Sequence, residues 1–395
     1  MVVSEKMYEL GSKRSAIREL FEYGKQRAAI VGPENVYDFS LGNPSIPAPD
    51  CVNETIRRLT ESMDSISLHG YTSAQGDLET RKAIADYLNR THKTSFTADN
   101  FYITMGAAAS LSICFKALTT GPSDEIIVIA PFFPEYRVFI EAAGAKCVMV
   151  PADTKAFQIQ FEELEKRISV NTKAIVINSP NNPSGAVYNE DTIKKLSALL
   201  DRKQKEFSTQ IFLIVDEPYR EIAYDVEVPF VTKYYNNTLV CYSYSKSLSL
   251  PGERIGWVLV PDEAYESKTL YAACAGAGRG LGYVCAPSLF QKMIVSCIGE
   301  TGDINAYRRN RDLLYEGLTK IGYHCFKPDG AFYMFVEALE EDAEAFGEKA
   351  KEEDLLVVPA TGFGCPGWVR ISYCVDTDMI RRSMPAFERL YKRYR

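Results

Sequence analysis

The sequence predicts an α/β protein: a three-layer αβα domain with a mostly parallel seven-stranded sheet, followed by a smaller α+β domain. Three observations support this fold class. Short β-branched runs alternate with helical patterns through the middle of the chain, which is typical of a parallel sheet covered on both faces. After Pro287 this rhythm changes to a long helical pattern followed by mixed strands and helices. The length of 395 residues and the 46% apolar composition suit two or three units with a large core.

Seven short apolar runs are the strand candidates of the predicted sheet. They cover residues 101–104, 125–130, 146–152, 174–179, 211–216, 239–244 and 254–261. Helical patterns separate most of them, including 111–118, 161–168 and 191–205. Only a short, turn-rich segment separates the last two strand candidates, which allows one of them to run antiparallel.

Both ends of the chain contribute to the smaller domain in this prediction. A helix is expected from Ser15, whose hydroxyl suits an N-cap, to about Ala29; it packs with the smaller domain or reaches a neighbouring molecule. After Pro287 the expected elements are helix 304–321, strand 331–336, a charged helix ending near residue 353, strands 355–358 and 369–373, and a final amphipathic helix. The predicted units are an N-terminal arm, 1–45, a large domain, 46–287, and a small domain, 288–395.

Charge and hydropathy argue against two classes of partner. The chain carries 45 basic and 52 acidic residues, a formal charge of -7, and no block of Lys or Arg stands out. A nucleic-acid-binding surface is therefore not expected. The longest apolar stretch, 126–134, is far too short to cross a bilayer, and the first twenty residues lack the apolar core of a signal peptide.

Cysteine and histidine usage favours a cytoplasmic protein without a metal site. The ten cysteines are scattered and form no Cys-x-x-Cys pair, which favours buried, reduced thiols over a disulfide framework. The histidines His69, His92 and His324 lie far apart, and none has the spacing of metal ligands.

The run from Ser243 to Trp257 carries the strongest chemical signal. Lys246 lies among four serines, and Arg254 follows eight residues later. An amine beside hydroxyl donors and a fixed cation suits a carbonyl cofactor that also bears a phosphate, because the lysine forms a Schiff base while the other groups hold the anion. The alternative is a serine-rich turn with an exposed lysine.

Two further segments follow strand candidates, where ligands of open α/β sheets bind. One segment leads into a helix and consists of Gly106, Ala107 and Ala108, so its amides and the helix N-terminus suit an anion. An ordinary strand-to-helix turn is the alternative. Phe133 lies in a turn between prolines and can stack on a planar ring, although a core aromatic cluster is the commoner use.

Three polar residues complete the set of candidates. Asn182 lies in a loop held by two prolines, and its amide can donate to a phenolate oxygen; a rigid turn is the alternative. Asp216 ends an apolar strand and would pair with a protonated pyridine nitrogen, unless it is an exposed strand end or a helix cap. Arg370 lies in an apolar strand and suits a substrate carboxylate, unless it pairs with an Asp or Glu.

One apparent motif is rejected. Residues 362–367 match the glycine pattern of dinucleotide-binding loops and follow a strand. They contain a proline and lead into another strand, whereas that pattern needs a helix N-terminus. A nicotinamide-dependent dehydrogenase is therefore not expected.

In order and spacing, these segments resemble the fold-type I pyridoxal-phosphate aminotransferases of class I and II, and most nearly the bacterial aspartate-aminotransferase-like proteins. The resemblance runs from Leu41 to Arg370. It implies that pyridoxal 5'-phosphate is the cofactor, that Lys246 forms the Schiff base, and that Asp216 keeps the pyridine nitrogen protonated. It also implies that Tyr219 and Asn182 donate to the phenolic oxygen, and that Phe133 stacks on the ring.

The resemblance assigns the remaining contacts too. Ser243, Ser245, Arg254 and the amides of 106–108 form the phosphate cup, where many relatives have a hydroxyl or glutamine in place of an alanine. Tyr71 reaches the phosphate of a partner subunit, which implies a homodimer with a shared active site. Arg370, with Gly42 and Asn182 nearby, holds the substrate α-carboxylate.

The implied activity is ping-pong transfer of an amino group from an L-amino acid to a 2-oxo acid, with aspartate and 2-oxoglutarate as a possible pair. Other chemistry at Cα stays open, such as that of a β-lyase, a decarboxylase or a cyclising synthase. A non-catalytic transcriptional sensor is disfavoured, because fewer than fifty residues precede Gly42. Arg279, in the glycine-rich run 276–280, is either a cation for a side-chain carboxylate on a mobile loop or an exposed arginine.

Overall fold

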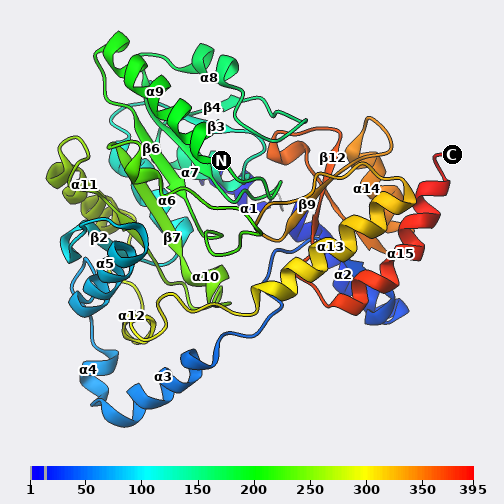
Figure 1. Ribbon diagram of the computed structural model, residues 1–395, viewed down its shortest axis with the longest axis horizontal. Coiled ribbons are helices and arrows are strands. Elements are labelled where there is room, and N and C mark those ends of the chain that lie inside the picture. Colours follow the sequence, from blue (N-terminus) through cyan, green and yellow to red (C-terminus); the bar gives the residue numbers. More distant parts are fainter. Residues whose placement is uncertain (1, 13–15) are drawn as a thin grey trace.

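The computed structural model describes residues 2–12 and 16–395, and it confirms the predicted fold class. Figure 1 shows a large sheet with helices on both faces at one end of the molecule and a smaller group of strands and helices at the other. The sheet has seven strands in the order β2-β8-β7-β6-β5-β3-β4. Each lies within two residues of its predicted bounds: β2 (Phe101–Thr104), β3 (Glu125–Ile129), β4 (Lys146–Val150), β5 (Thr172–Asn178), β6 (Phe212–Asp216), β7 (Thr238–Ser243) and β8 (Gly256–Leu259).

The direction of the strands gathers the chemically interesting residues at one edge. Strands β3 to β7 pair in parallel, and β8 runs antiparallel to both β7 and β2, as the short connection before it allows. Strand β2 therefore runs the same way as β7. The carboxyl ends of β2, β3, β5, β6 and β7 and the beginning of β8 consequently share one edge, the edge at which ligands of such sheets bind.

Side chains alternate across the sheet and bury both of its faces. In β3, Ile126 and Val128 join one core cluster, while Ile127 and Ile129 join another. The first cluster contains residues of α6 (Ala107–Leu118), α7 (Glu135–Ala143) and α11 (Ser267–Gly280), and the second contains residues of α8 (Phe161–Arg167) and α9 (Glu190–Phe207). This period of two is the pattern expected of a strand buried on both sides.

Helices from two distant parts of the sequence cover the β2 end of the sheet. Helices α3 (Asp50–Ser62), α4 (Ser65–His69) and α5 (Leu78–His92) contact α12 (Ser288–Ile294), which follows Pro287. Met293 and Ile294 of α12 share a core cluster with Trp257 and Leu259 of β8. The proposed boundary between the units at residue 287 stays a prediction, and α12 packs with the large sheet.

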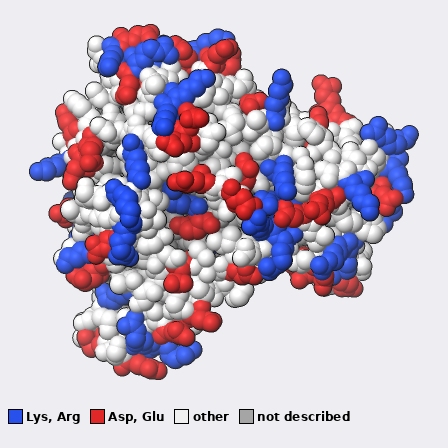
Figure 2. Space-filling model, in the orientation of Figure 1, with Lys and Arg blue, Asp and Glu red and all other residues white. Residues whose placement is uncertain are grey.

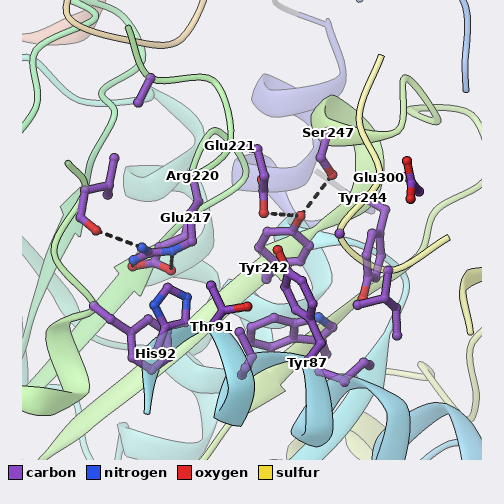
Figure 3. A pocket seen from close by; sticks show the side chains of 18 of the residues that line it. Tyr87, Thr91, His92, Glu217, Arg220, Glu221, Tyr242, Tyr244, Ser247 and Glu300 are labelled. Atoms are coloured by element: carbon purple, nitrogen blue, oxygen red, sulfur yellow. Dashed lines mark hydrogen bonds and ion pairs between the residues drawn. The ribbon is translucent and has the colours of Figure 1, made fainter. Parts of the chain in front are cut away.

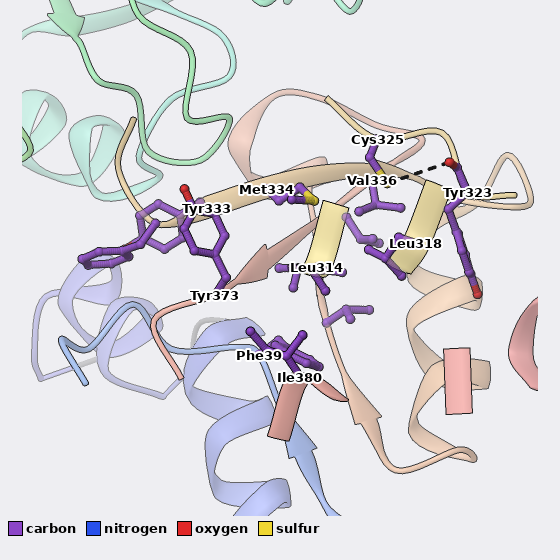
Figure 4. Packing of buried hydrophobic residues seen from close by; sticks show 14 of the residues in the cluster. Phe39, Leu314, Leu318, Tyr323, Cys325, Tyr333, Met334, Val336, Tyr373 and Ile380 are labelled. Carbon is purple, nitrogen blue, oxygen red and sulfur yellow. Dashed lines mark hydrogen bonds between the residues drawn. The ribbon is translucent and has the colours of Figure 1, made fainter. Parts of the chain in front are cut away.

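The smaller unit is built on an antiparallel sheet in the order β11-β12-β9. Its strands are β9 (Tyr333–Glu337), β11 (Val358–Pro359) and β12 (Trp368–Ser372), and its helices are α13 (Ile304–Ile321), α14 (Ala343–Lys351) and α15 (Thr377–Lys392). Figure 4 shows how the core closes: Leu314 and Leu318 of α13 and Ile380 of α15 pack under β9, beside Phe39.

The prediction of one continuous strand over residues 355–358 is wrong. The chain there forms β10 (Leu355–Leu356), which pairs in parallel with β1 (Tyr37–Asp38), and then β11, which pairs with β12. The chain passes from one sheet to the other at Val357. Because Val357 is buried like its neighbours, residues 355–358 form one apolar run, and nothing in this run indicates that the pairing strand changes.

The N-terminal segment packs on the smaller unit, as one of the two predicted alternatives has it. Helix α2 (Ala16–Val31) places Leu20 in a core cluster with Leu356 and Val358. The guanidinium of Arg27 pairs with Asp354, with 2.6 Å between Nε and Oδ1. A further helix, α1 (Glu5–Ser12), precedes it. The predicted N-cap, Ser15, lies outside the described residues.

Charges of both signs are interspersed on the face seen in Figure 2, without a large area of one sign. None of the helices that the structure describes is long and apolar enough to cross a bilayer. All ten cysteines are free thiols, and most are buried.

Candidate active site

One cavity of about 320 Å³ opens at the shared edge of the sheet and collects most of the predicted site residues. Helix α2 and strands β9 and β12 of the smaller unit also contribute to its wall. The predicted residues that line the cavity are Gly42, Ala107, Ala108, Phe133, Asn182, Asp216, Tyr219, Ser243, Ser245, Lys246, Arg254 and Arg370. Those of them that follow strands lie at the shared edge, as the strand-end rule predicts, and Gly42 and Arg370 join them from other parts of the chain.

Lys246 lies in the short helix α10 (Tyr244–Ser247), directly after β7. Its Nζ donates to the carbonyl oxygen of Gly42 at 2.7 Å. Burial, together with the positive charges of Arg370 and Arg254, lowers the pKa of Lys246 to about 8, although Cys374 opposes the shift. A neutral, nucleophilic amine is thus available close to neutral pH.

Asp216 ends β6 with one carboxylate oxygen satisfied and one free. The hydroxyl of Tyr136, on α7, donates to Oδ2, whereas Oδ1 is buried and has no hydrogen-bond partner. Burial raises the pKa of Asp216 to about 7; the charge of Glu217 acts in the same direction, and the Tyr136 hydrogen bond opposes it. A buried carboxyl without a cation is costly, so this side chain suits a positively charged ligand atom in the cavity.

Three elements meet to form a cradle for an anion. Ser243 caps α10, its Oγ lies 2.7 Å from Oγ of Ser245, and Nη1 of Arg254 lies 3.4 Å from the same Ser245 oxygen. Gly106 precedes α6 at φ 84°, and a Cβ there would lie 2.8 Å from Nη2 of Arg254. The glycine thus lets the N-terminus of α6 approach the guanidinium, which concentrates positive potential and hydrogen-bond donors at one point.

Arg370, on β12, is 2% exposed and lacks an acidic partner among the described residues. Its Nη1 donates to Oδ1 of Asn182 at 3.2 Å, its Nη2 donates to the carbonyl of Ser40 at 2.5 Å, and its Nε has no partner. Burial lowers the pKa of Arg370, yet a guanidinium stays charged. The predicted alternative, a structural ion pair, is not what the structure shows; the charge is available to a carboxylate.

Six residues that line the cavity were not among the predicted site residues: Ile17, Leu111, Asn178, Pro218, Pro251 and Tyr333. Tyr136, which contacts Asp216 without lining the cavity, was not predicted either. Asn178 donates to the carbonyl of Asp216 and accepts from the amide of Asn182, both at 2.7 Å, so it joins the two strand ends. Tyr333 lies with its hydroxyl 3.0 Å from that of Tyr219, and its ring lies 4.6 Å from the Arg370 guanidinium. Tyr136 holds Asp216, and Ile17 of α2 lines the entrance wall. Of these residues, only Asn178 could have been found from the sequence in the way that Asp216 was, because it is a polar residue at the end of an apolar strand.

Gly42 is required by the close approach of Tyr333. A Cβ at Gly42 would lie 1.8 Å from the Tyr333 hydroxyl. We expect Gly42→Ala to displace that ring, break its contact with Tyr219 and lower kcat/KM about tenfold to a hundredfold, because overpacking costs about 1–3 kcal/mol. Steady-state rates measure the effect. Gly121→Ala is the control, since a Cβ there meets nothing within 4 Å; equal activity of both variants would contradict the role given to the Gly42–Tyr333 contact.

Two predicted residues lie away from the cavity. Tyr71, between α4 and α5, is 94% exposed and does not line it. Arg279 is exposed on α11 and does not line it either. The expectation of a mobile loop at 276–280 is wrong: the alanines between these glycines favour helix, and Cys274 and Ala277 are buried against the core, so α11 continues to Gly280. Residues 362–367 lead into β12, as predicted.

Comparison with known proteins agrees with this geometry. The family model described as aminotransferase class I and II matches residues 34–387. A probable aspartate/prephenate aminotransferase of Aquifex aeolicus is 32% identical over 384 residues, which cover 90% of this chain and 92% of that protein.

Solved structures extend the likeness to the whole chain. An amino transferase from Eubacterium rectale superposes with a TM-score of 0.99 at 74% identity and covers 100% of this chain and 99% of that one. Aspartate aminotransferase from Thermus thermophilus with maleate gives a TM-score of 0.85 at 27% identity, with 96% of this chain and 97% of that one covered. The chain therefore belongs to the class I and II aminotransferase family and is an enzyme of the transaminase class.

Proposed function

We propose that this transaminase works with pyridoxal 5'-phosphate bound in the cavity around Lys246, and that it moves amino groups from an L-amino acid to a 2-oxo acid by a ping-pong mechanism. The observation that carries the proposal is the buried, unpartnered Oδ1 of Asp216, in the same cavity as a lysine with a lowered pKa and an anion cradle. A cationic ring nitrogen, an aldehyde and a phosphate are complementary to these three features.

The residues present fit this cofactor. Ser243, Ser245, Arg254 and the N-terminus of α6 would hold the phosphate, and Asp216 would hold the pyridine nitrogen. Phe133 lines the cavity where a ring would stack. Asn182 accepts from Arg370 through Oδ1, which leaves its amide nitrogen, with the Tyr219 hydroxyl, to donate to the phenolic oxygen. When bound, the cofactor supplies an aldehyde to Lys246 and an electron-accepting ring.

The side chains divide the remaining tasks of catalysis. Arg370 binds the α-carboxylate of the substrate through its free Nε and a neighbouring N–H, which fixes the orientation of Cα. Nζ of Lys246 would accept the proton from the substrate Cα and later donate it to the carbon that the cofactor's aldehyde group supplies. Asp216 stays ionised opposite a cation and stabilises the positive charge on the ring nitrogen. After the first 2-oxo acid leaves, a second enters by the same route.

Aspartate and 2-oxoglutarate are the first substrate pair to test, because several relatives are named aspartate aminotransferases. Among the described residues that line the cavity, the cations are Lys246, Arg254 and Arg370. Each of these already has a task in the proposal. A side-chain carboxylate would therefore need a cation from outside this set, and a screen of acidic, aromatic and small amino acids shows whether the enzyme prefers one.

Arg370→Lys should raise KM for the amino acid about tenfold to a hundredfold, with a smaller change in kcat. An ammonium cannot present two parallel N–H groups to a carboxylate, and it would also leave Asn182 or Ser40 without its donor. Initial rates over a range of amino-acid concentrations measure the change. Arg382→Lys, an exposed position on α15, is the control and should match the unmodified enzyme. An unchanged KM in Arg370→Lys would remove Arg370 from the carboxylate site.

The reaction type is tested by its products. Incubation with an amino acid and 2-oxoglutarate should yield glutamate and a new 2-oxo acid, and the two half-reactions should proceed separately. Release of ammonia in place of glutamate would favour the β-lyase alternative. The two reactions differ in which bond at Cα is held perpendicular to the ring.

The proposed homodimer rests on Tyr71, whose side chain is 94% exposed in the single chain. A large exposed aromatic side chain suits a contact with another molecule, and in the proposal it completes the phosphate site of a partner subunit. Sedimentation of the active enzyme tests this, and an active monomer would refute it.

A further inference from the structure

A second cavity, of about 240 Å³, lies directly behind the first. The same stretches of chain line both, because neighbouring residues at a strand end point to opposite sides. Asp216, Ser243 and Lys246 face the active-site cavity, whereas the residues that follow them, Glu217, Tyr244 and Ser247, face the second one. Figure 3 shows this second cavity between α5 and the segment that follows β6.

Aromatic rings form much of its wall. Tyr242 stacks on Trp257 with ring centres 4.9 Å apart and planes 18° apart, and Tyr244 meets Tyr242 edge-on at 5.0 Å. Tyr87 and Phe230 line the same space. Several rings around one small cavity attract an apolar body, and their electron-rich faces attract a cation.

Among the carboxyls that line this cavity, Glu221 has unused hydrogen-bonding capacity. Oε1 of Glu221 accepts from the Tyr242 hydroxyl at 2.9 Å, while Oε2 is buried and has no partner. The neighbouring pair is already complete: Arg220 donates to both oxygens of Glu217 and to the carbonyls of Val228 and Pro229. Arg220 therefore has little left to offer an anion, and within the described residues no cation forms an ion pair with Glu221, although the charge of Arg220 acts on it.

Two other titratable groups at this cavity, His92 and Glu300, add no positive charge. Burial lowers the pKa of His92 to about 4, so this histidine is neutral near pH 7. Glu300 lines the rim and is exposed. With Glu217 and Arg220 neutralising one another, the free charge at the cavity is negative.

We propose that this second cavity is a binding site for a small organic cation, with its ammonium group on Glu221 and its apolar body among Tyr87, Phe230, Tyr242, Tyr244 and Trp257. Nothing in the transaminase reaction uses these side chains. The Tyr242 hydroxyl donates to Glu221 and accepts from Ser247 at 2.9 Å, so two hydrogen bonds connect the proposed ammonium site to the residue that follows Lys246. The site is therefore placed to sense or influence the segment that carries Lys246.

The pH dependence of binding follows from the groups around Glu221. Burial raises the pKa of Glu221 to about 7; Glu217 acts in the same direction, while the Tyr242 hydrogen bond and Arg220 oppose it. Tyr87, Tyr244 and Ser247 also face this region and stay uncharged near neutrality. The ionised fraction of Glu221 rises from about a tenth at pH 6 to about nine tenths at pH 8, so the affinity for a cation should rise about tenfold over that range.

The test uses N,N-dimethylbenzylamine, a tertiary amine that cannot form an imine, and its uncharged carbon isostere isobutylbenzene. Titration calorimetry of the cofactor-loaded enzyme gives the affinity. Because the chain has two tryptophans, a Trp368→Phe background leaves Trp257 as the only indole, and its fluorescence reports where the ligand binds. We expect saturable binding of the amine, a change in Trp257 emission, and affinity for the isostere at least about tenfold lower.

Matched variants separate a local contact from a general effect of charge. Glu221→Gln keeps the acceptor for Tyr242 but loses the charge, so it should weaken binding at least about tenfold and abolish the pH dependence. Glu300→Gln removes the same charge at the exposed rim and should weaken binding less than about threefold. Equal loss in both variants, equal binding of isobutylbenzene, or binding without a Trp257 signal would each overturn the proposal. If Glu221→Gln misfolds, the pH series on the unmodified enzyme decides, and a flat series refutes the site.

Discussion

Replacing Lys246 by alanine is expected to abolish amino-group transfer, with turnover lowered at least about a thousandfold. The substitution removes the only amine of the active-site cavity within the described residues, and with it what the proposed mechanism requires, the covalent attachment of the cofactor and the base that moves the Cα proton. Rates with aspartate and 2-oxoglutarate, and the visible absorbance of the purified protein, measure both losses. Lys268→Ala, exposed on α11, is the control. Wild-type turnover in Lys246→Ala would end the proposed mechanism.

The same lysine gives a pH signature. With a pKa of about 8, about a tenth of the Lys246 amine is neutral at pH 7, compared with about one part in three thousand for a lysine of ordinary pKa. Capture of pyridoxal phosphate by the cofactor-free chain should accelerate about tenfold per pH unit below pH 8 and then level off. A rate that continues to climb at the same slope beyond pH 9 would show that burial and the nearby arginines do not lower the pKa of this amine.

Asp216→Asn should lower kcat about 10²- to 10³-fold while cofactor is still bound, the size of effect seen when one preorganised electrostatic contact is removed from an active site. The amide is nearly isosteric and can still accept from Tyr136, but it cannot hold a pyridine nitrogen in its cationic form. Single-turnover rates of the first half-reaction isolate the step concerned.

Two controls make the Asp216 result specific. Tyr136→Phe removes the hydrogen bond to Oδ2 and keeps the carboxylate, so we expect a loss of only about tenfold. Asp191→Asn, exposed on α9, should change nothing. Asp216→Asn keeps the hydrogen bond from Tyr136 and removes only the negative charge, so a loss no larger than that of Tyr136→Phe would contradict the role given to the charge.

Much of the site was predictable because the carboxyl ends of parallel strands lie at one edge of the sheet, so residues that follow different strands come close together. A polar residue at the end of an apolar strand is conspicuous, and the sheet order brings the ends of β5, β6 and β7 side by side. Asp216 is singled out by that reasoning, Lys246 by the serines and the arginine around it, and the roles of both come from the family resemblance. Arg370 is found differently, as a charge inside an otherwise apolar strand of the smaller unit.

Other parts of the site depend on packing between the two units, which local patterns do not encode. Tyr333 lies in a buried apolar run, residues 331–336, so nothing in the sequence distinguishes it as a ring that contacts Arg370. Ile17 occupies one turn of an ordinary amphipathic helix. The glycines at residues 276–280 suggest a loop, but the structure has a helix there. Burial of Cys274 and Ala277 outweighs the free-energy cost of glycine in a helix. The role proposed for Tyr71 would depend on a second subunit, about which the sequence of one chain gives no local signal.

The uncompensated guanidinium of Arg370 has a practical consequence for anyone who handles this enzyme. A cation sequestered from water without a counterion recruits whatever small carboxylate is dissolved nearby. Acetate or formate buffers will therefore compete with substrate and raise the melting temperature relative to chloride at equal ionic strength. The apparent KM for the amino acid will therefore be higher in such buffers than in chloride, because the buffer anion and the substrate carboxylate compete for Arg370.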